Sequence, residues 1–336
     1  MHRTLSGWEY FVLLKEAQSL LHNRMSKAYE TGMRQFRLDF GKFSLVIGIG
    51  RYFYITENPP QSAQTPTSLA MLLRKEISGK FLDSFKQHEN DRAYILEFSN
   101  EYKLVLEQFS YGNMFLLDSN NKIIRPYTFR PTEKKTYNAG DEYKFQESPQ
   151  INLLRNMDDW NKLRNENESK SAVSVLGRLS FGKIYSNNIL EKLGINREIS
   201  ISEISDSQAL KLITEISQMQ KSPQFLILKK GEDMELSLCP LEGWEEHKSF
   251  DSFSKAVEHF VSLGIEKKPV EERSPSQIRL EVRLLEQKKA LEKTETEISY
   301  LSSAAQFLRA NLEKIDALIL EAKKTGEKKI KLKIDV

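Results

Sequence analysis

Apolar and polar residues alternate along much of the first 145 residues, and this alternation is typical of half-buried β-strands. The clearest runs cover residues 93–98, 102–109, 113–118 and 122–125, with Ser119-Asn120-Asn121 as a tight turn between the last two. Strands that follow one another through short turns indicate antiparallel hairpins. This part of the chain is therefore predicted to be a β-rich α+β unit.

Helical spacing of apolar residues appears twice within this unit. Residues 8–23 show it first, and residues 67–78 show it again between a threonine cap and Gly79. Gly48 and Gly50 come in a G-x-G arrangement inside a strand-like run. Because a third glycine and a following helix are both missing, a bend in a strand fits them better than a phosphate loop.

The pattern changes after residue 150. Residues 151–221 have helical spacing with capping residues, whereas residues 224–239 return to strand character. A sheet interrupted by a helical insertion would explain this return, and a helix follows it. We predict four segments. Residues 1–150 form a first β-rich part and residues 151–221 a helical module. Residues 222–268 return to the first part, and residues 269–336 form a long helical arm with a terminal strand.

The helical module contains LGRLSFGKIYSNNILEKLGI, residues 176–195, which reads as a helix-hairpin-helix segment. Such a hairpin offers backbone N–H groups at the start of its second helix, where a phosphate binds well. Gly182 and Lys183 are therefore candidate phosphate-binding residues. Ser180 stands where such hairpins usually have the first of two glycines, which weakens this hypothesis. A helical packing module without a nucleic-acid role is the alternative.

An apolar heptad repeat dominates the last fifth of the chain. Its two sets of positions, seven residues apart, are Leu284, Leu291, Ile298, Ala305, Leu312 and Ile319, and Leu280, Gln287, Thr294, Leu301, Leu308 and Ile315. A helix over 277–323 would be roughly 70 Å long at about 1.5 Å per residue. No second heptad segment follows it. The sequence thus indicates a fragment or half of a split protein, with a complete protein that dimerises through this helix as the alternative.

Charges are almost balanced, with 50 Lys and Arg against 47 Asp and Glu and a formal net charge of +3. This balance excludes binding to nucleic acid by bulk charge alone, so RNA contacts must come from local patches. The segment 122–135 is one candidate, because aromatic residues alternate with cations that can hold phosphates. Its members are Lys122, Arg125, Tyr127, Phe129, Arg130, Lys134 and Lys135. The alternative is a solvated loop.

The remaining composition indicates a cytoplasmic protein without a membrane partner. No apolar run approaches the length of a membrane span, and the first residues lack the features of a signal peptide. The single cysteine, Cys239, cannot form an internal disulfide. The five histidines are scattered without metal-ligand spacing, so neither a metal nor a cofactor is expected.

Several short motifs occur in a fixed order: NRMSKAYETG, PPQSAQTPTSLAMLLRKEISGKFL, DRAYILEF, GNMFLLDSNNKIIRP, AGDEY, YSNNILEKLGI and LSLCPL. This order resembles the N-terminal half of the NFACT family and covers almost all of the chain. The resemblance implies a β-rich first domain similar to that of formamidopyrimidine-DNA glycosylases, an inserted helix-hairpin-helix module and a coiled-coil helix. The family's C-terminal RNA-binding domain and second coiled-coil arm are absent from the sequence.

The resemblance also implies a function in ribosome-associated quality control. A member of this family binds the large ribosomal subunit when a peptidyl-tRNA is stranded on it, and recruits tRNA so that the nascent chain is extended without mRNA. The ribosomal RNA performs the peptidyl transfer, so the protein is expected to position its partners and not to be an enzyme. The expected partners are the large ribosomal subunit, tRNA, and a second chain or missing half that pairs with the coiled coil.

Individual residues acquire roles from this resemblance. Asp91 and Arg92 match the family's DR pair, which handles tRNA, and a planar guanidinium can grip a phosphate or stack on a base. Glu9 stands where the family usually has an aspartate, and Glu107 matches its glutamate before the GN hairpin. Tyr111 replaces the usual cation there. We expect these residues to share one tRNA-binding surface, whereas the alternative for the DR pair is a charged turn.

Two other classes of protein fit the sequence less well. A glycosylase of similar fold uses an N-terminal proline as its nucleophile and a zinc finger of four cysteines, but this chain begins Met1-His2 and has one cysteine. A coiled-coil scaffold or adhesion protein is the other class, because a long helix with exposed charges would serve it. Co-sedimentation with large ribosomal subunits would separate the scaffold from the quality control factor.

We expect the isolated chain to associate through its heptad seam, because an unpaired seam exposes more contiguous apolar surface than a monomer usually tolerates. Light scattering at increasing protein concentration measures this association. A strict monomer at high concentration would contradict the prediction.

Overall fold

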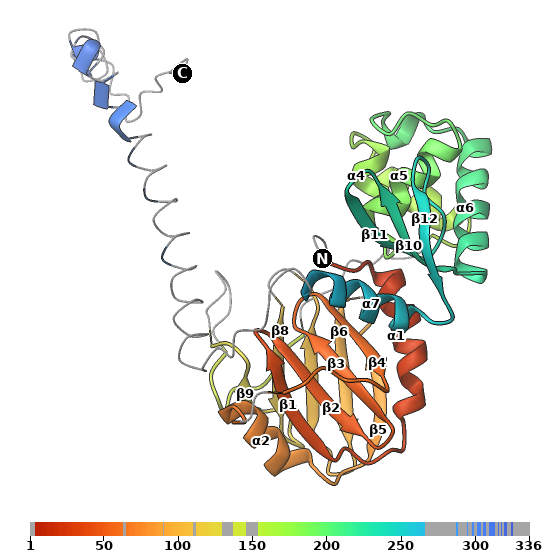
Figure 1. Cartoon of the computed structure of the whole chain (residues 1–336). Coiled ribbons are helices and arrows are strands. Elements are labelled where there is room, and N and C mark those ends of the chain that lie inside the picture. The colour runs from red at the N-terminus through yellow and green to blue at the C-terminus, as the bar shows by residue number, and fades with distance from the viewer. Residues whose placement is uncertain are drawn as a thin grey trace. The chain divides into compact units, whose positions relative to one another are not determined.

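The computed structural model describes residues 4–62, 65–89, 91–109, 112–129, 137–145 and 154–265, together with separate positions between 287 and 324. The chain divides into two compact units, residues 1–270 and 271–336. The first unit contains three antiparallel sheets and the helices around them (Figure 1). It confirms the mixed α+β class that the alternating pattern predicts.

The first sheet has four strands in the order β1-β2-β3-β4, all antiparallel. They are β1 (Lys27–Gly32), β2 (Gln35–Phe40), β3 (Phe43–Gly48) and β4 (Tyr52–Thr56). Every second residue of β2 is buried, which places one face of the sheet in the core and leaves the other partly open. The buried residues of this strand are Phe36, Leu38 and Phe40.

The second sheet has five antiparallel strands in chain order. They are β5 (Leu82–Gln87), β6 (Ala93–Phe98), β7 (Lys103–Glu107), β8 (Asn113–Leu117) and β9 (Ile123–Pro126). The strands predicted from alternation are confirmed, with ends that differ by one or two residues. The tight turn predicted between the last two strands also exists.

The two sheets face each other and share one hydrophobic core (Figure 1). Phe53 from the first sheet lies 5.2 Å from Tyr94 of the second, ring centre to ring centre. Helix α1 (Gly7–Ala17) continues into the short 3-10 helix η1 (Gln18–Leu20), and α2 (Ser68–Ile77) ends just before Gly79. Gly79 has a φ of +79°, which is the left-handed conformation expected of a glycine after a helix.

Residues 154–221 are helical, as predicted for this part of the chain. They form α3 (Met157–Glu166), α4 (Ala172–Leu176), α5 (Gly182–Lys192), the 3-10 helix η2 (Ile201–Glu203) and α6 (Asp206–Lys221). The buried faces of these helices join the same hydrophobic core cluster as the two sheets. Helices α4 and α5 occupy the predicted hairpin, while its assignment as a helix-hairpin-helix motif stays a prediction.

The next strands form a sheet of their own, in the order β11-β10-β12. These strands are β10 (Phe225–Lys230), β11 (Asp233–Ser237) and β12 (Glu245–Phe250). The expectation that residues 224–239 rejoin the first part's sheet is therefore wrong. The physical reason is that β10 already pairs on both edges, with β11 through a tight turn and with β12 on the other side.

Helix α7 (Phe253–Ile265) does return to the first sheet. The backbone N–H groups of Phe253 and Ser254 donate to the Glu16 carboxylate of α1 at 2.7 and 2.8 Å. The Thr56 hydroxyl at the end of β4 donates to Glu258 at 2.6 Å. Within the predicted segment 222–268, the contact with the first part of the chain is thus made by helix α7. The segment boundaries stay predictions.

The second unit is described only at separate positions. Gln287, Thr294 and Ile298 have helical conformation, and five apolar side chains in this stretch are exposed: Ile298, Leu301, Leu312, Ile319 and Leu320. The continuous heptad helix and the terminal strand lie mostly outside the described residues and stay predictions. Among the described helices, none has the length and apolar character to cross a membrane.

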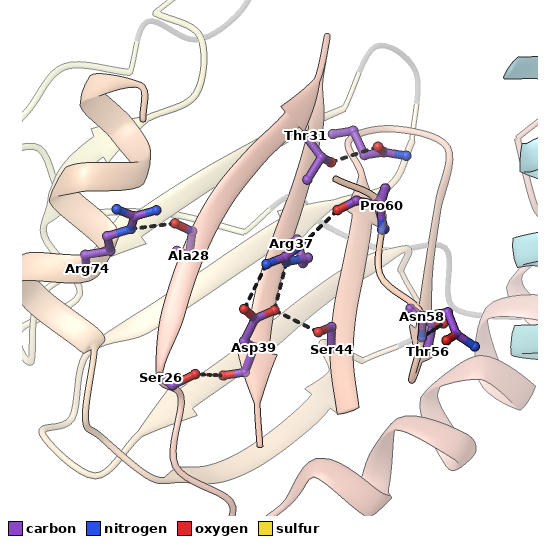
Figure 2. A network of polar contacts seen from close by, with 11 residues as sticks. Ser26, Ala28, Thr31, Arg37, Asp39, Ser44, Thr56, Asn58, Pro60 and Arg74 are labelled. Atoms are coloured by element: carbon purple, nitrogen blue, oxygen red, sulfur yellow. Dashed lines mark hydrogen bonds and ion pairs between the residues drawn. The ribbon is translucent and has the colours of Figure 1, made fainter. Parts of the chain in front are cut away.

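A polar network on the open face of the first sheet holds the loop after β4 (Figure 2). Two nitrogens of the Arg37 guanidinium lie 2.9 and 3.1 Å from the Asp39 carboxylate oxygens. The third nitrogen, Nη1, donates to the Pro60 carbonyl at 2.8 Å. The Ser44 hydroxyl donates to the same carboxylate at 2.7 Å. Arg37 therefore joins the sheet to the proline-containing loop.

We expect Arg37→Ala to lower the free energy of unfolding by about 1–3 kcal/mol, because it leaves the largely buried Asp39 without its cation. Lys42→Ala is the matched control, since the Lys42–Glu57 pair is exposed (71% and 49%) and contributes less than about 1 kcal/mol. Urea unfolding of both variants measures the difference. Equal losses would show that the network does not hold the loop.

Candidate nucleic-acid interface

The turn between β5 and β6 ends with Asp91 and Arg92. The Asp91 N–H donates to the His88 carbonyl at 3.1 Å, and the Arg92 N–H donates to Asp91 Oδ1 at 2.7 Å. From the end of the neighbouring strand, the Gln108 N–H donates to the Arg92 carbonyl at 2.8 Å. Hydrogen bonds therefore fix the backbone of the pair on both sides.

Both side chains of the pair are half-buried, and no ion pair joins them in the described part of the chain. Arg92 Nη1 makes a long contact of 3.4 Å with the Leu5 carbonyl, and among the described residues the other guanidinium donors have no hydrogen-bond partner. Tyr94 lies fully buried next to the pair. Burial raises the pKa of Tyr94 well above its ordinary value, and the charge of Arg92 acts against this rise.

Glu107 is placed inside the protein, not on the expected surface. It is buried at the end of β7, where it accepts a hydrogen bond from the Tyr143 hydroxyl at 2.8 Å. Burial and the nearby Glu107 charge raise the pKa of Tyr143. The surface expectation is therefore corrected, because residues 137–145 cover this end of the sheet. A role of Glu107 in tRNA binding stays a prediction. Because the carboxylate is buried, it could act only by positioning other residues.

Glu9 is also buried, with no exposed surface. Its carboxylate accepts hydrogen bonds from the Ser6 N–H at 2.6 Å and the Tyr185 hydroxyl at 2.8 Å. The Tyr185 hydroxyl in turn accepts from the Leu238 N–H at 3.0 Å. The expected surface position of Glu9 is corrected here too. In the sequence, Ser6-Gly7-Trp8-Glu9 has the pattern of a helix capping box. In the structure, the Ser6 side chain accepts from the Glu9 N–H and the Glu9 side chain accepts from the Ser6 N–H.

The other predicted residues lie apart from the DR pair or outside the described part. Tyr111 and Arg130 lie outside the described residues. Lys122 is exposed at the opposite end of the second sheet, before β9 begins. Arg125 is half-buried and donates to the Ser68 hydroxyl at 3.1 Å. The roles of all four in RNA binding stay predictions.

The hairpin before α5 packs against the start of α1. The Trp8 N–H donates to the Ser180 carbonyl at 2.8 Å, and the Gly182 N–H already donates to Leu179 at 2.9 Å. A Cβ atom added to Gly182 would lie 3.1 Å from the Ser6 Cβ, so the glycine allows this close approach. Lys183 is exposed beside it. Phosphate binding by Gly182 and Lys183 stays a prediction.

Two glycine turns pack backbone to backbone near the DR pair, and the sequence did not reveal this contact. A Cβ atom on Gly112 would lie 2.3 Å from the Gly50 Cα, and Gly112 also has a φ of +65°. Arg34 Nη2 donates to the Gly112 carbonyl at 2.9 Å and ties the first sheet to the second. The strand-bend interpretation of Gly48 and Gly50 is wrong, because Gly48 ends β3 and Gly50 lies in the hairpin turn before β4, with a φ of +77°.

The described residues contain no group of three or more His, Cys, Asp or Glu side chains that could hold a metal ion. Cys239 is buried, and burial raises the pKa of its thiol to about 11. A thiol with such a pKa is protonated at neutral pH and unreactive as a nucleophile. Within the described part of the chain, the candidate site is thus a hydrogen-bonded polar turn with the half-buried guanidinium of Arg92.

The fold defines an α+β protein in which two packed antiparallel sheets are followed by a helical module and a third sheet. The sequence profile of the NFACT N-terminal and middle domains matches residues 12–333. The chain belongs to the NFACT family.

The relatives with established names are ribosome quality control proteins. The archaeal Rqc2 homologue aRqcH of Methanocaldococcus jannaschii is 26% identical, over 98% of this chain and 53% of that protein. Ribosome quality control complex subunit 2 of Saccharomyces cerevisiae is 34% identical over 132 residues, which are 37% of this chain and 13% of that protein. The chain spans about half the length of the archaeal relative and less of the yeast one.

A solved structure supports the fold. The N-terminal part of the fibronectin/fibrinogen-binding protein from Streptococcus suis aligns with a TM-score of 0.59 and 16% identity, over 77% of this chain and 99% of that one. At this identity the likeness shows the fold alone.

We expect Tyr185→Phe to lower the free energy of unfolding by about 1–3 kcal/mol. The change removes one donor from the buried Glu9 carboxylate and the acceptor of the Leu238 N–H. Tyr102→Phe is the matched control, because that tyrosine is half-buried and should change stability by less than about 0.5 kcal/mol. Urea unfolding measures both, and equal stability of the two variants would contradict the assigned role of Tyr185.

Proposed function

We propose that this chain acts in ribosome-associated quality control by recruiting tRNA to a large ribosomal subunit that carries a stranded peptidyl-tRNA. The nascent chain is then extended at its C-terminus without mRNA. Family membership and the names of the relatives support the pathway. The observation that supports the tRNA assignment is the hydrogen-bonded backbone of Asp91 and Arg92 together with the half-buried Arg92 guanidinium, which makes one long hydrogen bond among the described residues.

The geometry of the pair suits RNA better than a purely structural turn. A guanidinium presents its donors in a plane, so Arg92 can hold a phosphate through two hydrogen bonds or lie flat on a base. The second oxygen of the Asp91 carboxylate can accept a base N–H, while Oδ1 is occupied by the Arg92 backbone. A fixed backbone lowers the entropy lost when these side chains bind.

The protein contributes position and not chemistry in this proposal. Peptide bond formation belongs to the ribosome, and the chain holds the tRNA and the subunit in the required arrangement. No cofactor is needed for that role, and the cytoplasm is the compartment where it would operate. The heptad helix would supply a surface for a second chain or for the remainder of a longer protein.

Adhesion is the second candidate function, since the aligned Streptococcus suis protein carries the name of a fibronectin and fibrinogen binder. That name belongs to a protein that is 16% identical to this chain. It therefore suggests an experiment and assigns no ligand to this chain. Binding of the chain to immobilised fibronectin or fibrinogen, without binding to ribosomal subunits, would favour adhesion.

We expect the double variant Asp91→Ala/Arg92→Ala to stay folded and to lose tRNA affinity by about ten- to a hundredfold, which corresponds to a lost charge-assisted contact. Arg92→Lys should lose part of this affinity, because it keeps the charge but not the planar fork. Filter binding of tRNA and a thermal melt measure the two properties.

The matched control for the double variant is Arg197→Ala/Glu198→Ala. Arg197 and Glu198 are likewise a cation and an acid adjacent in sequence; their side chains lie 3.4 Å apart and are exposed (66% and 64%) in the helical module. It should leave tRNA affinity within about twofold, as expected for an exposed ion pair that touches no ligand. Unchanged affinity in a well-folded Asp91/Arg92 variant would refute the tRNA assignment.

A further inference from the structure

Phe129 is an exposed aromatic residue just after the second sheet. Its side chain is 51% exposed, which is unusual for phenylalanine in a well-packed domain. Two other exposed phenylalanines each have a cation over the ring: Lys15 lies 4.7 Å from the centre of Phe11, and Arg24 lies 5.1 Å from that of Phe81. Within the described residues, neither a cation nor another ring lies over Phe129.

The backbone before Phe129 is held by the buried side chain of Asn113. Its Nδ2 donates to the Thr128 carbonyl at 3.1 Å, and its Oδ1 accepts from the Thr128 N–H at 3.1 Å. The amide thus replaces a neighbouring strand and pairs with both polar groups of one residue. Thr128 is fixed, and Phe129 is presented beside it.

Tyr127 adds rigidity on the other side of Thr128. Its N–H donates to the Met114 carbonyl at 2.7 Å, and its ring packs edge-on against Phe36 at 5.7 Å. The Arg34 guanidinium lies over the Tyr127 ring at 5.4 Å while it binds the Gly112 carbonyl. Phe129 therefore projects from a segment that both sheets hold.

The strand register brings this segment to the same end of the sheet as the DR pair. Ala93 pairs with Glu107, Glu107 pairs with Asn113, and Asn113 holds Thr128. The row thus runs from the residue after Arg92 to the residue before Phe129. Three strand spacings of about 4.8 Å place its ends about 14 Å apart, a distance that a few nucleotides of single-stranded RNA can span.

We propose that Phe129 is a base-stacking residue, which binds an unpaired base of the RNA whose neighbouring nucleotides contact Asp91 and Arg92. The proposal rests on the proposed function for the choice of RNA as partner. An exposed ring and a cation at the same end of a sheet suit single-stranded nucleic acid, because the ring covers a base while the cation holds the backbone. The half-buried Arg125 on β9 adds a second cation three residues before Thr128.

Phe129→Leu tests the proposal on the full chain, because it keeps an apolar side chain and removes the flat ring. Two probes are used: unfractionated tRNA, and a short single-stranded RNA that contains 2-aminopurine, whose fluorescence falls when the base stacks. We expect Phe129→Leu to weaken binding of both probes by about five- to a hundredfold and to abolish the fluorescence change. Phe129→Trp should restore both.

Phe11→Leu is the matched control, since Phe11 is equally apolar and 46% exposed on α1. It should leave both readouts unchanged. Affinity of Phe129→Leu within about twofold of Phe11→Leu, with an unchanged fluorescence signal, would overturn the stacking role. Binding of fibronectin or fibrinogen that Phe129→Leu abolishes, without any RNA binding, would overturn it in favour of a protein partner.

The same assay separates this proposal from the proposed function. If Asp91→Ala/Arg92→Ala leaves tRNA binding intact while Phe129→Leu weakens it, the stacking role stands and the DR assignment fails. If the wild-type chain binds the single-stranded RNA with quenching but does not bind tRNA, stacking is supported and tRNA recruitment is refuted. Absence of binding to either RNA overturns the stacking role.

Discussion

The buried carboxylate of Glu9 is the constraint on which the arrangement of the first unit depends. A carboxylate without solvent must receive hydrogen bonds, because an unpaired buried charge is very unfavourable. Here the donors come from the start of α1 and from Tyr185 on α5, and the same tyrosine hydroxyl binds the Leu238 N–H after β11. One acid thus joins the two-sheet core, the helical module and the third sheet, so none of the three can shift without exposing unpaired polar groups.

This constraint acts on the candidate site through the chain before α1. Leu5 is fully buried just ahead of the Ser6 cap, and its carbonyl is the contact of the Arg92 guanidinium. The opposite side of the site is held by backbone packing of Gly50 on Gly112 and by Asn113. The site is consequently built from turns whose positions follow from rigid elements on both sides. Such support keeps ligand-binding groups in place when they are carried by turns.

Local pattern was enough to predict the strands, because alternation and turn residues are encoded within a few positions. The ends of β6 were predicted correctly, and Gly79 marked the end of α2. Partners far apart in sequence could not be predicted in this way. Tyr185 is 176 residues from Glu9 and Tyr143 is 36 from Glu107, so neither tyrosine partner is indicated by the sequence around its glutamate; the capping box near Glu9 indicates only its bond to Ser6. The sheet of β10 was missed for the same reason, since alternation identifies a strand and not its neighbours.

Burial of the two glutamates also changes the electrostatics of the site. The family resemblance placed Glu9, Asp91 and Glu107 around one arginine, a cluster that would repel phosphate. In the structure two of these acids are enclosed and bonded to tyrosine hydroxyls, and one Asp91 oxygen is occupied by a backbone N–H. Of these three acids, Asp91 is therefore the one that stays partly exposed where a phosphate would approach Arg92. A chain with a net charge of only +3 can attract RNA where acids are enclosed and a cation stays partly exposed.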